Sequence, residues 1–178
     1  LSAIRNFYIA STAMAGVYTI GIGGDYPTIT SAVEALETFG VGGTVTFNIF
    51  TGIYDERIVI GPVTGASSIN QIVFQSQSGN YADVKLKNSL QNDSLNYVML
   101  FEEASHITIR NVWIQASVPS AGRLIEFRGV SRKITIEKNL FHGISTNNND
   151  TKRAILFAEN SLMDSINIIE NIFKYTEQ

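Results

Sequence analysis

The sequence predicts an all-β protein, a right-handed parallel β-helix of about five coils with a capping helix at its N-terminal end. Three observations predict it: a long internal repeat, short strands of alternating apolar residues, and asparagines that follow these strands. The length of 178 residues suits one domain. We therefore expect residues 1–178 to form a single β-helix domain, with 1–43 as the cap region and 44–178 as the coils.

The repeat is most visible as a column of phenylalanines, each in a short apolar segment. The five members are Phe47, Phe74, Phe101, Phe127 and Phe157. Successive members differ in residue number by 27, 27, 26 and 30. In a parallel β-helix each coil returns to the same place about 4.8 Å higher, so equivalent inward residues lie on top of each other. We expect these five rings to form one stack.

A second apolar column and a set of asparagines support the same fold. The column consists of Ile60, Leu86, Ile109, Ile136 and Ile168. Four of these strands are followed by an asparagine, namely Asn88, Asn111, Asn139 and Asn171. Asparagine tolerates the left-handed conformation and binds backbone groups at tight bends, so we expect these residues at corners between strands. A β-sandwich is the alternative, but its strands recur at much shorter intervals and without a long period.

The two ends of the coils are predicted to differ. Residues 28–40 have apolar positions at helical spacing between Pro27 and Gly40, which favours a helix over the open end of the first coil. After residues 172–175 no helix or polar strand follows. Because a bare β-helix end exposes unpaired backbone groups, we expect further coils or another chain to cover it, as in a fragment of a longer protein.

Composition excludes several classes of function. The net charge of −3, with no block of lysine and arginine, argues against nucleic acid as a partner. No stretch approaches the roughly 18 consecutive apolar residues of a membrane-spanning helix, so membrane insertion is not expected. With no cysteine and two histidines, neither a metal site nor a cofactor is expected.

The N-terminal part of the chain, to about residue 60, resembles the start of pectin methylesterases and, more broadly, the pectin lyase-like superfamily of parallel β-helix repeat proteins. The segments that carry the resemblance are 24–29, 32–36, 43–45 and 52–60. The resemblance implies a secreted or cell-surface, bacterial type of protein with a polysaccharide as its partner. A shared cap and first coil produce this likeness without shared chemistry.

The catalytic residues of that family do not carry over. Pectin methylesterases resemble one another in two aspartates and an arginine on the first sheet, whereas no aspartate flanks the phenylalanine column here. Glu102, Glu126 and Arg128 remain as catalytic candidates, a carboxylate pair beside a guanidinium. The favoured alternative is a solvated salt bridge between coils, which contributes little.

The binding candidates are Trp113 and Arg110. Alternation predicts that Trp113 points outward, where a flat ring can stack on a sugar, with His106 and His142 nearby. An aromatic side chain covered by a loop or another chain is the favoured alternative. The variable connections at 116–123 and 144–153, the latter with the polar run at 147–150, mark the corner where recognition is expected.

The sequence thus predicts a non-catalytic module of a secreted or cell-surface protein, structural, adhesive or in contact with carbohydrate. The alternative is a carbohydrate-active enzyme, a polysaccharide lyase or pectin esterase, whose active site is truncated or divergent. Turnover of acidic glycans distinguishes the two.

Overall fold

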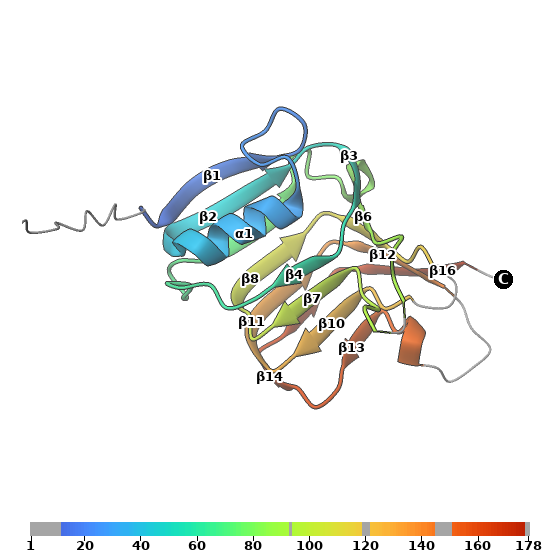
Figure 1. Ribbon diagram of the computed structural model, residues 1–178. Helices are drawn as coiled ribbons and strands as arrows, with labels where there is room; N and C mark the ends of the chain where they lie inside the picture. The colour runs from blue at the N-terminus through green and yellow to red at the C-terminus, as the bar shows by residue number, and fades with distance from the viewer. Residues whose placement is uncertain (1–11, 93, 119–121, 145–150, 177–178) are drawn as a thin grey trace, which may run out of the picture.

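The computed structural model describes residues 12–92, 94–118, 122–144 and 151–176 (Figure 1). In this part the chain is rich in β-strands, and every strand pairing is parallel. The prediction of a β-rich chain is confirmed. Among the described residues no helix is both long and apolar enough to span a membrane.

The strands form three sheets, here called A, B and C. Sheet A contains β1 (Met14–Ile20), β2 (Val41–Ile49), β5 (Ile72–Ser76), β8 (Ser105–Arg110), β11 (Val130–Glu137), β14 (Leu162–Asp164) and β15 (Asn167–Ile169). Sheet B contains β3 (Gly52–Asp55), β6 (Val84–Lys87), β9 (Trp113–Gln115), β12 (Leu140–Ile144) and β16 (Ile172–Thr176). Sheet C contains β4 (Ile58–Ile60), β7 (Met99–Glu102), β10 (Ile125–Arg128) and β13 (Leu156–Ala158).

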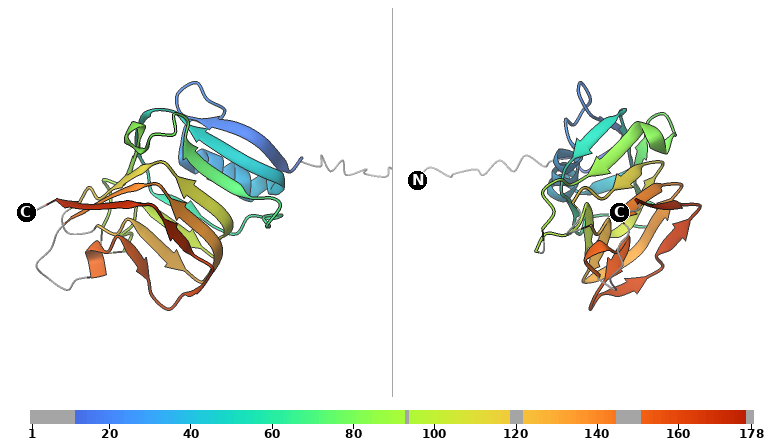
Figure 2. Two further views of the ribbon diagram at one scale, coloured as in Figure 1. Left: turned by 180° about the vertical axis from the view of Figure 1, so that it is seen from behind. Right: turned by 90° about the vertical axis from the view of Figure 1, so that its right-hand side faces the viewer.

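From β2 onward the chain passes from sheet A to B to C and then returns to A. We call one such pass a circuit. Each strand pairs with the equivalent strand of the next circuit, so β2 pairs with β5, β3 with β6 and β4 with β7. Both views of Figure 2 show the later strands lying beside the earlier strands of the same sheet.

The register shows that the predicted single phenylalanine stack is wrong. Phe47 pairs with Phe74 in sheet A, whereas Phe101 pairs with Phe127 in sheet C. Their ring centroids are 4.7 Å and 5.4 Å apart. Phe157 is not part of either stack, because it pairs with Glu126 on the opposite face of the strand.

The second predicted column is also divided among the sheets. The observed column of sheet A runs through Phe47, Phe74, Ile109, Ile136 and Ile168. That of sheet B runs through Tyr54, Leu86, Ile114, Phe141 and Phe173. That of sheet C runs through Ile60, Phe101, Phe127 and Ala158. Most of these side chains are buried and belong to one apolar core.

Two predicted asparagines form a ladder at the corner between sheets A and B. Asn139 is fully buried; its Oδ1 accepts from the Val112 N–H at 3.0 Å, and its Nδ2 donates to the Ile109 carbonyl at 3.0 Å. Asn171 Oδ1 accepts from the Asn139 N–H at 2.9 Å in the next circuit. Asn111 has a left-handed φ of 55° at the same corner. Asn88 lies at another corner, where its Nδ2 donates to the Tyr97 carbonyl at 2.9 Å.

The predicted helix is present as α1 (Ile29–Phe39). Thr28 caps its first turn, and Gly40 ends it with a φ of 66°. The apolar face of α1 is buried, and the helix contacts β4 and β1, the first strands of sheets C and A (Figure 1). Glu56 fixes the N-terminal turn, because its carboxylate accepts hydrogen bonds from the N–H groups of Ile29 and Thr30.

At the opposite side the last strands leave apolar side chains in solvent. In β14 to β16 the apolar side chains that are more than 40% exposed are Leu162, Met163, Ile168, Ile169, Ile172, Phe173 and Tyr175. That another chain or further coils cover them stays a prediction. Of the two connections of variable length, residues 119–121 and 145–150, including the polar run at 147–150, lie outside the described residues.

Candidate functional site

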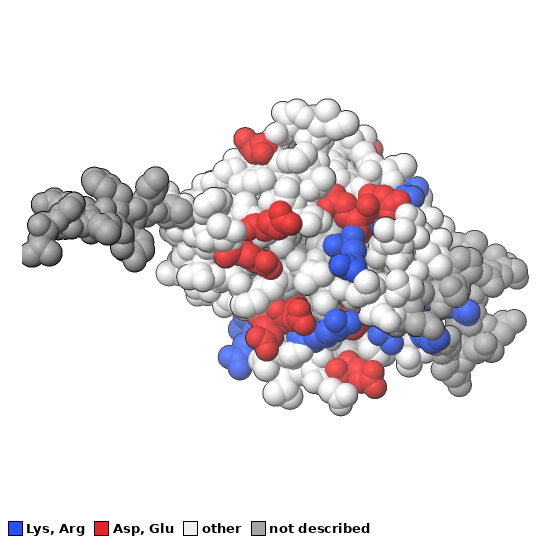
Figure 3. Space-filling view, viewed as in Figure 1, with Lys and Arg blue, Asp and Glu red and all other residues white. Residues whose placement is uncertain are grey.

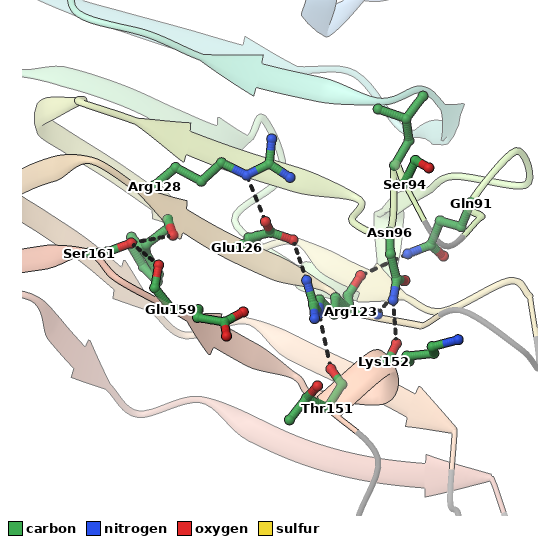
Figure 4. A network of polar contacts seen from close by, with 12 residues as sticks. Gln91, Ser94, Asn96, Arg123, Glu126, Arg128, Thr151, Lys152, Glu159 and Ser161 are labelled. Carbon is green, nitrogen blue, oxygen red and sulfur yellow. Dashed lines mark hydrogen bonds and ion pairs between the residues drawn. The ribbon is translucent and has the colours of Figure 1, made fainter.

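Two of the three catalytic candidates, Glu126 and Arg128, meet on the outer face of sheet C (Figure 4). Glu126 Oε1 accepts from Arg128 Nε at 2.7 Å, and Oε2 accepts from Arg123 NH1 at 3.0 Å. The Glu126 side chain is 5% exposed, compared with 17% for Arg123 and 40% for Arg128. Glu126 and Arg128 are therefore paired, but within one strand, β10 (Ile125–Arg128), rather than between circuits, and through a carboxylate that is buried rather than solvated.

Glu126 is buried because connections from two other circuits pack around it. Asn96, which precedes β7, accepts from the Arg123 N–H at 3.2 Å and donates to the Lys152 carbonyl at 2.7 Å. Gln91 donates to the Arg123 carbonyl at 2.8 Å. Lys152 belongs to η2 (Thr151–Arg153), the short 3₁₀ helix before β13, and Arg123 Nε donates to the Thr151 carbonyl at 2.9 Å. Arg123 thus holds together the connections of three successive circuits.

Aromatic rings complete the surroundings of the two arginines. The Arg123 guanidinium lies 3.3 Å from the ring centroid of Phe157, and the Arg128 guanidinium lies 5.3 Å from that of Tyr97. Tyr97 is 3% exposed, and this burial raises the pKa of its phenol. Arg57 and Arg128 act in the opposite direction on that pKa. The aromatic faces and the carboxylate together stabilise guanidinium groups that are partly withdrawn from water.

This geometry does not suit acid–base catalysis by Glu126. Each of its oxygens accepts a short hydrogen bond from a guanidinium, so the carboxylate is held as an acceptor instead of facing a reacting atom. Glu102 is exposed and pairs in register with Arg128, but it forms no ion pair with any residue that the structure describes. Acidic and basic side chains are interspersed over this face, without a field of one sign (Figure 3).

The predicted orientation of Trp113 is confirmed, because Val112 and Ile114 on either side of it are buried. Its ring is not free to stack on a sugar, however. Lys85 Nζ lies 3.7 Å from the ring centroid, and the His142 ring stacks on it at 6.0 Å between centroids. The indole Nε1 is buried and has no partner among the described residues.

Arg110 is also engaged, on a different sheet from Trp113. Its Nε donates to Gln75 Oε1 at 2.7 Å, and its NH1 lies 3.5 Å from Glu137 Oε1. Gln75 Nε2 in turn donates to Asn48 at 2.8 Å, so the outer face of sheet A carries a polar ladder across four strands. The structure thus assigns Trp113 and Arg110 to separate sets of neighbours and does not join them in one binding surface.

Sequence reasoning missed Arg123, Asn96 and Gln91. The signal available was a pair of opposite charges at i and i+3, Arg123 and Glu126, at the start of a strand. Neither amide was assigned a role by the repeat pattern, since each lies in a connection. Within the described residues no group of three or more histidine, cysteine, aspartate or glutamate side chains is suited to a metal ion.

No protein-family model matches the chain, and neither a curated protein nor a solved structure matches it. The function is therefore inferred from the geometry of the site alone.

Proposed function

We propose that the three sheets are the walls of a right-handed parallel β-helix, with α1 as its N-terminal cap. The proposal is supported by the repeated order of sheets A, B and C, by parallel pairing between equivalent strands, and by the apolar columns in register. Such a fold is a rigid, elongated unit in which each coil contacts only its neighbours. A relationship with the pectin lyase-like superfamily remains part of this proposal.

We propose further that this unit is a non-catalytic module of a secreted or cell-surface protein, with a structural or adhesive role. The observation that carries this proposal is the state of Glu126, whose two oxygens are both bound by arginines in a buried position. A carboxylate held in this way positions Arg123, whose other hydrogen bonds join neighbouring circuits. Catalysis by the same group would require one of its oxygens to reach a substrate proton.

The test is an assay for turnover. The protein is incubated with pectins, alginates and other acidic glycans, and eliminative cleavage and ester hydrolysis are measured. We expect neither activity. Eliminative or esterase turnover by the unaltered chain that disappears in Arg128→Ala, with the circular dichroism spectrum preserved, would overturn the proposal in favour of a carbohydrate-active enzyme.

A further inference from the structure

The outer face of sheet A carries a polar hollow that the proposed function does not use. Its volume is about 210 Å³, and it lies over the paired strands β8 and β11. All of its lining side chains are polar: Ser68, Gln71, His106, Thr108, Lys133, Thr135 and Asn167. A polar hollow on the outside of an apolar core is a feature that packing alone does not require.

Three residues in the left-handed conformation are stacked beside the hollow, and two of them, His106 and Lys133, line it. His106, Lys133 and Ser165 have φ values of 58°, 53° and 58°. The register of the flanking pairs aligns these three positions in successive circuits. Residues other than glycine, asparagine and aspartate seldom adopt this backbone conformation, because it brings the side chain close to the backbone. A histidine and a lysine in this conformation are thus held by the strand register next to the hollow.

The charge of the hollow is positive. Among the described residues, Lys133 is the one permanently charged side chain that lines it, and no carboxylate does. The Asp164 carboxylate accepts from the Ser165 hydroxyl at 2.8 Å and does not line the hollow. Lys133 Nζ donates to the Ser165 hydroxyl at 2.6 Å, and one serine thus separates the ammonium from the Asp164 carboxylate. Lys133 forms no direct ion pair with a described carboxylate, so part of its charge remains available to an anion.

The remaining lining groups supply hydrogen bonds of the kind that an oxyanion takes. Thr108 and Thr135 pair directly in register, so their side chains occupy adjacent positions on the floor of the hollow. Asn167 continues the same row on β15. The His106 imidazole forms no hydrogen bond with any described residue. Hydroxyl, amide and imidazole N–H groups around one ammonium suit a carboxylate or a sulfate.

We infer that this hollow is a binding site for a single oxyanionic group, a carboxylate or a sulfate, carried by a ligand of about the size of one sugar ring. Lys133 supplies the charge, and His106, Thr108, Thr135 and Asn167 supply the polar contacts. Binding there depends on the hollow over sheet A and not on the network of sheet C. The inference of an anion site can therefore be refuted without refuting the non-catalytic role proposed above.

The experiment is a titration of the ¹⁵N-labelled protein followed by NMR at constant ionic strength. The probes are sodium sulfate, sodium acetate, glucose 6-sulfate and glucose, so that the anion and the sugar ring are tested separately. We expect saturable shifts of the backbone amides of His106, Thr108, Lys133 and Thr135 with sulfate or acetate, and dissociation constants on the order of millimolar. Glucose alone should leave these amides unchanged.

Matched variants separate a site from general attraction to a positive surface. Lys133→Asn removes the ammonium and keeps a residue that tolerates the left-handed conformation, and we expect about tenfold weaker binding. Lys138→Asn is the control, because Lys138 also has a left-handed φ of 56° but is not among the residues that line the hollow. It should change the affinity by less than about twofold, as screened distant charges do.

Two results would overturn the inference. One is a set of shifts that fails to saturate with any of the anions, or that spreads evenly over surface lysines and arginines. The other is an equal loss of affinity in Lys133→Asn and Lys138→Asn, since that would show dependence on net charge alone. Both variants alter exposed side chains, so an unchanged circular dichroism spectrum confirms that folding is not the cause.

Discussion

Replacing Glu126 with glutamine removes the central charge of the network on sheet C while keeping the size of the side chain. The glutamine accepts from one arginine but presents its own NH₂ group to the other. A hydrogen bond to a charged group contributes about 1.5–3 kcal/mol, and removing one member of a buried ion pair costs about 3–5 kcal/mol. Because Arg128 is 40% exposed and can be rehydrated, we expect a loss below that of a fully buried pair, about 2–3 kcal/mol.

Urea unfolding followed by fluorescence measures this loss, with the single tryptophan, Trp113, as the reporter. With a denaturant slope of about 2 kcal/mol per molar, the midpoint of Glu126→Gln should fall by about 1 M or somewhat more. The control is Glu102→Gln, an exposed carboxylate in register with Arg128, for which the change should stay within about 0.5 kcal/mol. Equal midpoints for the two variants would refute the reasoning that burial makes Glu126 a stabilising group.

Three further predictions concern the corners and the bends. Asn139→Ala leaves two buried backbone groups without a partner and should lower the unfolding free energy by about 2–4 kcal/mol in the same assay. Gly65→Ala should destabilise far more than Gly79→Ala, although both have a left-handed φ, because only the first places a Cβ against the Val41 carbonyl oxygen; equal melting temperatures would contradict this. Burial acts to raise the pKa of Asp55, but hydrogen bonds from Ser89 and Lys87 outweigh it and lower that pKa, so its contribution to stability is present above about pH 4 and lost as the pH falls further. Midpoints measured between about pH 6 and pH 2 should therefore decline less in Asp55→Asn than in the unaltered chain.

Local features were predictable because they depend on neighbours in the sequence. The helix at 28–40 has its apolar spacing, its capping threonine and its terminating glycine within one segment. The outward position of Trp113 follows from alternation alone. The corner role of Asn139 follows from the ability of its amide to satisfy backbone groups at a bend.

The alignment of the phenylalanines failed for a physical reason. Every inward position of the three sheets meets the same apolar core, so a phenylalanine carries no information about which sheet it occupies. The connection between β6 and β7 lengthens that circuit. Phe101 therefore lies in sheet C, although its distance of 27 residues from Phe74 predicted a place in the same sheet as Phe74. Strand pairing between circuits decides which sheet a phenylalanine occupies, and the spacing of the phenylalanines along the sequence does not reveal that pairing.

The candidate site was predictable in part. Glu126 and Arg128 were expected on one outer face and are paired there. Their burial was not predicted, because it depends on Asn96 and η2, which belong to the circuits before and after that of Glu126 and are distant from it in the sequence. The histidine and lysine of the hollow each precede an Ile-Thr-Ile strand, so the sequence could have aligned them, but it did not show the left-handed backbone that places them beside the hollow.

The position of α1 has a consequence for the order of events during synthesis. The first strands of sheets B and C, β3 and β4, find their strand partners only when the next circuit has emerged, whereas β2 pairs with β1, which is translated before it. The helix is translated before β2 to β4 and contacts β4 directly. Each new circuit that leaves the ribosome can pair with the free edge of the circuit before it, while α1 contacts the first circuit through β4. This favours growth in one direction and limits pairing between neighbouring nascent chains.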